Sequence, residues 1–179
     1  MNYDKIQTFT GRYIDPVNPK PDDISITDIA HALSNCCRFA GHTKDFYSVA
    51  QHSVLVSMQC DPRDAMHGLL HDASEAYLTD LPKPVKHNST GTLDFFRALE
   101  NKLSAVIWKK FGLATIEPPS VREADRRILS TEIRDLTHFK RSIDPNENDP
   151  YEFEIRPLDP IDAKYYFLAR YKELGGKED

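Results

Sequence analysis

The chain of 179 residues is 40% hydrophobic and 28% charged, and its formal net charge at pH 7 is −5. These values are typical of one soluble globular domain over 1–179, and they supply no basic stripe for binding a nucleic-acid duplex. No apolar run is long enough to span a membrane and the first residues do not resemble a signal peptide, so we expect no membrane partner. The three cysteines, two of them adjacent, make a poor disulfide framework, which favours a reduced, cytoplasmic protein.

Helix signals dominate the chain after an extended N-terminal arm. Proline, glycine and aspartate are frequent in residues 1–22, which we predict to form an extended arm or a short hairpin. Ser25 or Thr27 can cap the first helix, because their hydroxyls can accept hydrogen bonds from the first free amides. Ser48 can cap the second helix in the same way, and Pro62 suits the first turn of the third. The expected helices span residues 26–39, 49–60, 63–78, 92–112, 120–139 and 160–174.

The remaining segments are connectors and one candidate strand. Residues 81–91 and 142–150 contain prolines among polar residues and are expected to be connectors. Ser120 follows two prolines and can cap the helix that begins there. Residues 151–155 form the best strand candidate, and a strand near Phe9 is its candidate partner. We therefore predict an all-α helical bundle in a single domain, with room for a small β hairpin.

Four side chains on different predicted helices are candidate ligands of a metal ion. His52 lies on the apolar stripe of its helix, His71 and Asp72 are adjacent on the next one, and Asp125 lies near the start of a later one. Imidazole nitrogens and carboxylate oxygens together suit a divalent ion such as Zn, Co, Mn, Fe or Mg. Each residue alone has a simpler interpretation, because a buried histidine is often a core residue and an aspartate in a first turn stabilises the helix dipole. Their combination favours the metal site.

Two further residues of the predicted helix 63–78 bear on this chemistry. Glu75 is four residues beyond His71, so on a continuous helix it shares a face with His71 and can act as a general acid or base. A surface glutamate paired with a lysine or arginine is the alternative interpretation. His67 and His71 have the spacing by which zinc proteases hold their metal, but no glutamate follows His67. We therefore expect His67 to lie on the helix surface or behind a ligand.

An anionic substrate needs cationic groups near the metal. Arg38 is the first candidate, since a guanidinium can bind a phosphate through two hydrogen bonds at once. Lys83 and Lys86 follow Asp80 in the connector and can either contribute to the same site or remain solvated surface charges. Asp80 can brace the loop or accept a hydrogen bond from a sugar hydroxyl. The sequence thus favours a phosphate-bearing ligand.

This pattern resembles the HD-domain metal-dependent phosphohydrolases, whose signature is H…HD…D on helices. The likeness covers residues 38–136 and is closest to the bacterial 5′-deoxynucleotidases of the YfbR-like type. Its most specific part is "HDASEAYLTDLPKPVK" at residues 71–86. "QHSVLVS" around His52 and "EAD" ending at Asp125 follow the family pattern in the same order.

The resemblance implies an all-α bundle in which His52, His71, Asp72 and Asp125 hold a divalent metal ion. It also implies that Glu75 acts together with the ligand Asp72 in catalysis. Two more residues would bind substrate, Arg38 at the phosphate and Asp80 at a sugar hydroxyl, and Lys83 stays a candidate substrate-binding residue from its place in the connector. Phe39 stands where the family has a tryptophan that restricts the 2′ side of the sugar, so selectivity for deoxyribose stays open.

The function implied by the resemblance is hydrolysis of nucleotides, with two main alternatives. The first is a 5′-nucleotidase that releases phosphate from deoxynucleoside monophosphates. The second is a deoxynucleoside triphosphate triphosphohydrolase, because "TFTGRYIDP" and "FYSVAQHS" are similar to segments of compact bacterial and phage HD hydrolases. A phosphodiesterase would need further ligands, for which His42, His67 and His87 are candidates, and a nucleotide sensor without activity is the remaining reading.

The expected helix 92–112 has a long apolar face that includes Trp108. We expect this face to belong to the core rather than to a cofactor site. Part of it can form a surface between subunits, and the resemblance implies a homo-oligomer, a dimer or larger.

Overall fold

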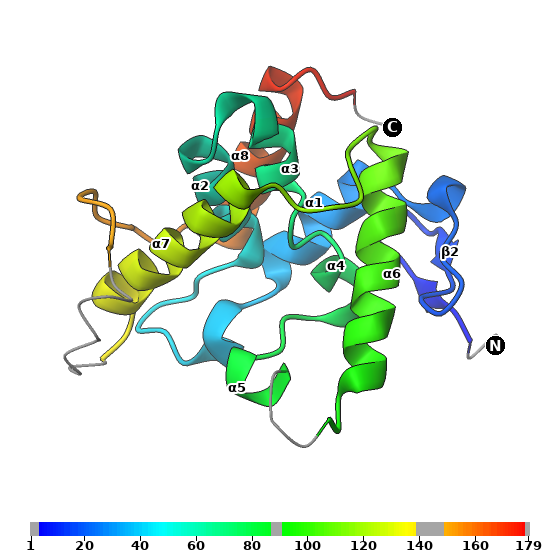
Figure 1. The fold of residues 1–179 in the computed structure, drawn as a ribbon, viewed down its shortest axis with the longest axis horizontal. Coiled ribbons are helices and arrows are strands. Elements are labelled where there is room, and N and C mark those ends of the chain that lie inside the picture. The colour runs from blue at the N-terminus through cyan, green and yellow to red at the C-terminus, as the bar shows by residue number, and fades with distance from the viewer. Residues whose placement is uncertain (1–3, 87–90, 139–148, 178–179) are drawn as a thin grey trace.

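Helices carry nearly all of the regular structure of this protein (Figure 1). The structure is a computed structural model and describes residues 4–86, 91–138 and 149–177. The prediction of an all-α fold with a small hairpin is confirmed. None of the helices in these ranges combines the length and the apolar character needed to cross a membrane. The helices are α1 (Ile26–Asn35), α2 (Val49–Gln59), α3 (Ala65–Leu69), α4 (Glu75–Leu78), α5 (Lys83–Lys86), α6 (Asp94–Lys110), α7 (Pro119–Leu136) and α8 (Pro160–Glu173), with 3₁₀ turns η1 (Pro21–Asp23), η2 (Arg38–Gly41) and η3 (Pro62–Asp64).

The N-terminal arm forms the short hairpin that its composition predicts. Strand β1 (Ile6–Gln7) pairs antiparallel with β2 (Tyr13–Ile14). Phe9 lies in the turn between them and stacks on the ring of His31, with the ring centroids 3.8 Å apart. The hairpin therefore attaches to α1 and does not extend into a larger sheet.

The strand predicted over 151–155 is wrong. This segment bends at Glu152 and Phe153, and its backbone groups bond to side chains of α7 instead of to a neighbouring strand. Arg134 donates to the carbonyls of Tyr151 and Phe153 at 2.7 and 2.6 Å. Asp135 accepts a hydrogen bond from the amide of Ile155 at 2.9 Å. A polar helix face thus satisfies backbone groups that would otherwise need a strand partner.

Two of the three predicted helix caps are confirmed. The Ser25 hydroxyl accepts from the amide of Asp28 at the start of α1, and the Ser48 hydroxyl accepts from the amide of Gln51 at the start of α2. The cap predicted at Ser120 is wrong, because its hydroxyl donates to Asp64 across the interface with η3.

Several predicted boundaries differ from the structure, and α7, for example, ends at Leu136 instead of residue 139. Helix α1 ends at Asn35 instead of residue 39, since Cys37 is extended and forms an isolated antiparallel bridge with Ser48. The connector expected over 81–91 contains the one-turn helix α5. Most of the connector expected over 142–150 lies outside the described residues.

The continuous helix predicted over 63–78 is also wrong, and its interruption matters for the site. Turns over residues 70–74 separate α3 from α4. The indole of Trp108 donates to the carbonyl of Leu70 at 2.9 Å, and a ring nitrogen of His71 bonds to the carbonyl of Gly68 at 2.8 Å. In a continuous helix these carbonyls would accept from amides four residues ahead. Side chains bond to both carbonyls here, and the Leu70 carbonyl also accepts from the amide of Ala73, three residues ahead, so His71 and Asp72 project from a turn.

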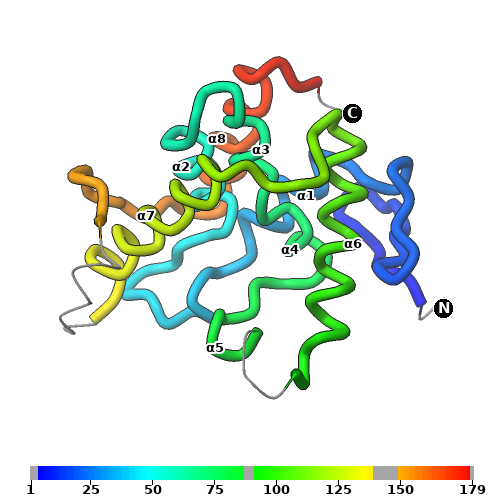
Figure 2. The backbone as a smooth tube through the Cα atoms, viewed as in Figure 1, coloured from blue at the N-terminus to red at the C-terminus, as the bar shows by residue number. Residues whose placement is uncertain are grey.

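Helix α2 is the central element, packed against α1, α3, α7 and α8. In the view of Figures 1 and 2, α6 and α7 lie on opposite sides of the molecule, and α5 lies near the bottom between them. A large apolar cluster joins α1, α2, α3, α6 and α8, which gives the polar site a rigid support. Its fully buried members include Ile29, Leu33, Val49, Leu69, Leu103, Ile107 and Phe167.

The tight approach of α3 to α2 depends on Gly68. A Cβ on Gly68 would lie 2.9 Å from the Cys60 sulfur and 3.1 Å from the Ser57 Cα. We expect Gly68→Ala to lower the free energy of unfolding by about 1–3 kcal/mol, since overpacking outweighs the better helix propensity of alanine. Urea denaturation measures this loss. The same substitution in a Cys60→Ala background should cost less, and equal costs in the two backgrounds would contradict this account.

Candidate metal centre and adjoining cavity

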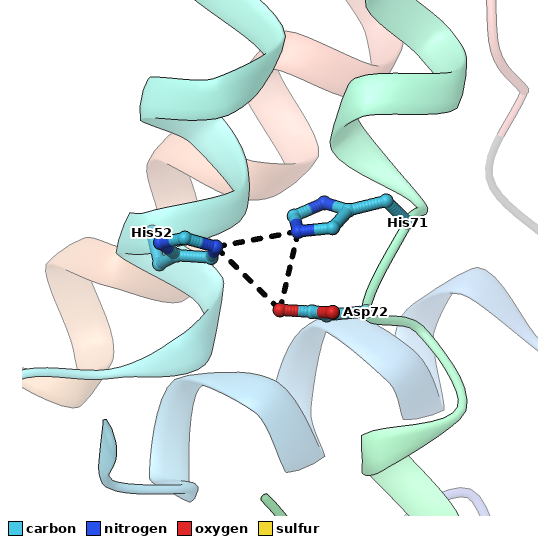
Figure 3. Close-up of side chains that lie close together, drawn as sticks. All are labelled: His52, His71 and Asp72. Carbon is cyan, nitrogen blue, oxygen red and sulfur yellow. Dashed lines mark hydrogen bonds and ion pairs between the residues drawn. The ribbon is translucent and has the colours of Figure 1, made fainter. Parts of the chain in front are cut away.

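Three predicted metal ligands converge on one point (Figure 3). The Nε2 atoms of His52 and His71 lie 3.3 Å apart. The Asp72 Oδ2 lies 3.5 Å from the Nε2 of His52 and 3.2 Å from the Nε2 of His71. One ligand atom from each residue lies within 4.8 Å of the other two. Helix α2 supplies His52, and the turn after α3 supplies the other two residues.

The fourth predicted ligand comes from α7. The Asp125 Oδ1 lies 3.2 Å from the Nε2 of His52, the same atom that faces His71 and Asp72. Asp125 therefore approaches the same atom of His52, although it is not one of the three residues whose ligand atoms all lie within 4.8 Å of one another. Two imidazole nitrogens and two carboxylates form a donor set that zinc and similar divalent ions accept.

The hydrogen bonds of the two rings show why a cation fits this point. The Nδ1 of His52 lies 2.6 Å from Glu132, and the Nδ1 of His71 lies 2.8 Å from the carbonyl of Gly68. Both partners are acceptors, so both Nδ1 atoms carry the proton. In the neutral rings the Nε2 lone pairs then face each other beside the carboxylates of Asp72 and Asp125. Such a group of acceptors needs a metal ion or extra protons between its members.

The close approach of these groups also shifts the pKa values of His71 and Asp125. Burial disfavours a charged imidazole, yet the Asp72 carboxylate raises the pKa of His71 to about 10. Burial would raise the pKa of Asp125, but the contact with His52 holds it below its usual value. The cluster thus attracts positive charge strongly. A metal ion must compete with protons for the Nε2 atoms, so its affinity should fall as the pH falls.

Glu132 is a site residue that the sequence analysis missed. It is fully buried on α7, and its Oε1 accepts from the Tyr47 hydroxyl at 2.9 Å as well as from His52. Its Oε2 accepts from Arg38 at 3.1 Å. Burial opposes ionisation, but Arg38 and His52 hold the pKa of Glu132 below its usual value. Glu132 follows Asp125 by seven residues, about two turns of helix, so this spacing was the signal that could have identified it.

A cavity of about 330 Å³ adjoins the metal centre. It lies between α7, α5 and the segments that follow α1 and α4. Every residue predicted to take part in catalysis or to bind substrate lines it, namely Arg38, Phe39, Asp72, Glu75, Asp80 and Lys83, as does the ligand Asp125. Sequence-distant residues are therefore gathered on one concave surface, as in a small-molecule site.

Arg38 and Glu75 are buried cavity residues with incomplete hydrogen bonding. The Arg38 Nη1 lies 3.5 Å from Asp72, but its Nε has no hydrogen-bond partner among the described residues. The Glu75 Oε2 also has no partner there, and its Oε1 lies 3.9 Å from the Lys86 ammonium. Burial and the charges of Asp72 and Asp80 raise the pKa of Glu75 well above its usual value. Buried polar atoms without partners are typical of groups reserved for a ligand.

The helix break changes how Glu75 reaches the cavity. Glu75 and His71 were predicted to share the face of one helix, but Glu75 begins α4, beyond the turns that carry His71. The common cavity of Asp72 and Glu75 thus results from the turns and not from helical spacing.

The two lysines differ in their contacts. Lys83 is mostly exposed, with its ammonium 3.7 Å from Asp125, whereas Lys86 bonds to Glu100 at 2.6 Å. Both line the cavity. Lys83 is thus the more exposed charge at its rim, and Lys86 is paired with Glu100.

The expected surface position of His67 is wrong. His67 is buried against Trp108, with the ring centroids 4.5 Å apart, and bonds to the carbonyl of Ala114 at 3.1 Å. Trp108 packs against the apolar core, as predicted. His42 is exposed and His87 lies outside the described residues. None of the described extra histidines therefore joins the four ligands.

Backbone strain is concentrated around the cavity. Phe39, Ala40 and Thr79 are the non-glycine residues with positive φ in the described chain, at 54°, 51° and 70°. Phe39 lines the cavity, and Thr79 directly precedes Asp80, which also lines it. Side chains disfavour such conformations by about 1–3 kcal/mol each, so they persist where the surroundings or the function require them.

Thr79 provides a direct measure of this strain. With φ 70° and ψ 156°, it occupies a region that is almost exclusive to glycine. We expect Thr79→Gly to stabilise the protein by about 1 kcal/mol and to raise the melting temperature by about 2–4 °C. Thr79→Ala keeps a Cβ and should give no such increase. Equal melting temperatures for the two variants in differential scanning calorimetry would contradict the assignment of strain.

Comparisons with known proteins place the chain among relatives whose function is not characterised. No model of a known protein family matches the chain. It is 37% identical over 124 residues to an uncharacterized protein of Rhodobacter capsulatus, covering 64% of this chain and 62% of that protein. It is 43% identical over 174 residues to the uncharacterized protein YfdR of Escherichia coli (strain K12), covering 94% of each chain. The chain therefore belongs to the family of YfdR.

Proposed function

We propose that this protein is an HD-type phosphohydrolase that uses a divalent metal ion, such as Zn, Co, Mn or Mg, to hydrolyse nucleotides. The observation that carries the proposal is the pair of facing Nε2 atoms of His52 and His71, beside the carboxylates of Asp72 and Asp125. The buried guanidinium of Arg38, with a free Nε, adjoins this group. A cation bound between the four ligands and a phosphate bound to Arg38 would supply the contacts that these groups lack.

The chemistry assigned to the metal ion is general. When bound, a dication polarises a phosphoryl oxygen and lowers the pKa of water. Arg38 would hold the phosphate by charge-assisted hydrogen bonds and neutralise the charge that develops on it. Asp80 would accept a hydrogen bond from a sugar hydroxyl, Phe39 would pack against the sugar, and Lys83 would draw anions to the rim.

Glu75 is the residue proposed to transfer a proton. Water must lose a proton as its oxygen bonds to phosphorus, and the leaving oxygen of the substrate must gain one as the ester bond breaks. Burial and the nearby carboxylates raise the pKa of Glu75, so it holds a proton more readily than an exposed glutamate, which suits a group that transfers a proton. The unpartnered Oε2 leaves one oxygen of Glu75 available for it.

Charge around the cavity favours a monophosphate as the substrate. Four carboxylates line it, those of Asp72, Glu75, Asp80 and Asp125, against the cations of Arg38 and two lysines. A triphosphate brings more negative charge, which these carboxylates would repel. Release of phosphate from deoxynucleoside monophosphates is therefore the preferred reaction. We further propose that the protein acts in the cytoplasm as a homo-oligomer. Triphosphate release from deoxynucleoside triphosphates is the second candidate, ahead of a phosphodiesterase or a sensor.

The reaction is tested by removing metal with a chelator and restoring Zn, Co, Mn or Mg one at a time. Each form is assayed with the four deoxynucleoside monophosphates and the four triphosphates, and the products are identified. We expect phosphate from monophosphates and no turnover without metal. Triphosphate as the product would establish the second candidate instead. No turnover with any metal would contradict both.

Loss of a metal ligand should abolish turnover without unfolding the protein. We expect His71→Ala and Asp72→Ala to eliminate metal binding and activity while the far-ultraviolet circular dichroism stays helical, since the apolar core lies apart from the ligands. His42→Ala is the matched control, because His42 is exposed and outside the cluster. Near-normal activity in either ligand variant would contradict the proposal.

Glu75 should affect the chemical step more than metal binding. We expect Glu75→Gln to lower kcat by about 10²–10⁴-fold, the usual contribution of a general acid or base, with metal affinity close to that of the wild type. Glu123→Gln, an exposed change on α7, serves as the control. An unchanged kcat in Glu75→Gln would remove Glu75 from the mechanism.

A further inference from the structure

Glu132 holds two functional side chains with one carboxylate. Its Oε1 accepts from the Nδ1 of His52 at 2.6 Å, and its Oε2 accepts from the Nη2 of Arg38 at 3.1 Å. The Tyr47 hydroxyl donates a third hydrogen bond at 2.9 Å. Glu132 and His52 are fully buried, and Arg38 nearly so. The bonds come from α2 and from the segment between α1 and α2, which meet α7 at this point.

This arrangement is hard to explain by stability alone. Removing a carboxylate and a guanidinium from water costs several kcal/mol, and apolar side chains of similar volume often stabilise a core as well or better. What a buried, fully bonded carboxylate adds is fixed geometry for its partners. The partners here are a metal ligand and the candidate phosphate-binding group, so the geometry it fixes belongs to the site.

We propose that Glu132 is a positioning residue that sets the metal ligand His52 and the anion-binding Arg38 relative to each other. This inference rests on the proposed function in assigning those two roles. By accepting from Nδ1, Glu132 fixes the tautomer of His52 that presents a lone pair on Nε2, and it increases the basicity of that atom. By accepting from Nη2, it fixes the plane of the guanidinium.

Glu132 also competes with a metal ligand for Arg38. The second carboxylate near Arg38 is Asp72, whose Oδ2 lies 3.5 Å from Nη1, beyond the distance of a good hydrogen bond. The same Oδ2 atom faces His52 and His71 at the metal point. Without Glu132, the buried guanidinium would have Asp72 as its remaining described ion-pair partner. Arg38 would then compete with a metal ion for one ligand oxygen.

The test measures two affinities that require no turnover. Competition with a chelator gives the affinity for Zn and Mn, and calorimetry with inorganic phosphate at saturating metal gives the affinity for the anion. We expect Glu132→Gln to weaken metal binding by about 10–100-fold, the usual cost of losing a partner of a metal-ligating histidine. Phosphate binding should weaken by about tenfold or more. Glu123→Gln, an exposed glutamate on the same helix, is the matched control.

An Arg38→Ala background separates the two roles of Glu132. Adding Glu132→Gln to Arg38→Ala should cause no further loss of phosphate affinity, because the guanidinium that Glu132 positions is absent. The loss of metal affinity should persist, since His52 still lacks its partner. Normal phosphate binding by Glu132→Gln at saturating metal, or a loss that adds fully to that of Arg38→Ala, would overturn the proposal.

A second variant covers the case in which Glu132→Gln does not fold. Glu132→Asp keeps the charge but is one methylene shorter, so it cannot reach His52 and Arg38 together. At least one of the two affinities should fall tenfold, and retention of both would overturn the proposal. Binding of metal and phosphate without hydrolysis of any nucleotide would contradict the proposed function alone. A wild-type protein that binds neither would overturn both.

Discussion

His52, His71 and Asp72 converge on one point with Asp125 against His52, and holding these polar groups together is the main demand on the fold. Four hydrogen-bond acceptors face one another there once both Nδ1 atoms are committed to other partners. Such a group is unfavourable without positive charge, so the fold must hold it together by other means. The apolar packing of α2 against α1, α3 and α8 supplies that support.

The break between α3 and α4 follows from this constraint. A continuous helix would place successive side chains about 100° apart, so His71 and Asp72 could not both reach the Nε2 atom of His52 with ease. The turns over 70–74 bring both to the same point. The indole of Trp108 donates a hydrogen bond to the carbonyl of Leu70, where these turns begin. A residue of the core on α6 thus contributes to the geometry of the candidate metal centre.

The cavity next to the metal centre combines buried charges, unpartnered polar atoms and strained backbone. Each of these features lowers stability. Proteins commonly concentrate such costs at functional sites, where ligands complete the missing contacts. The coincidence of all three features around Arg38, Glu75 and Asp80 is therefore independent support for a ligand site at this place.

Structural features that depend on neighbouring residues could be predicted from the amino-acid sequence alone. The caps at Ser25 and Ser48, the all-α class and the N-terminal hairpin each follow from a few adjacent side chains. The four candidate ligands were also identified, because their residue types and order are specific. The identities of these four residues, however, do not indicate how close their side chains lie in the folded protein.

Structural features that depend on contacts between distant segments are visible only in the folded chain. Trp108 helps to break the helix 63–78, and α7 side chains satisfy the backbone of residues 151–155, so both segments depart from their local patterns. Glu132 acquires its meaning from Arg38 and His52, which are far away in the sequence. These hydrogen bonds join residues that are far apart in the chain and come together only when the chain folds. No pattern of neighbouring residues therefore predicts them.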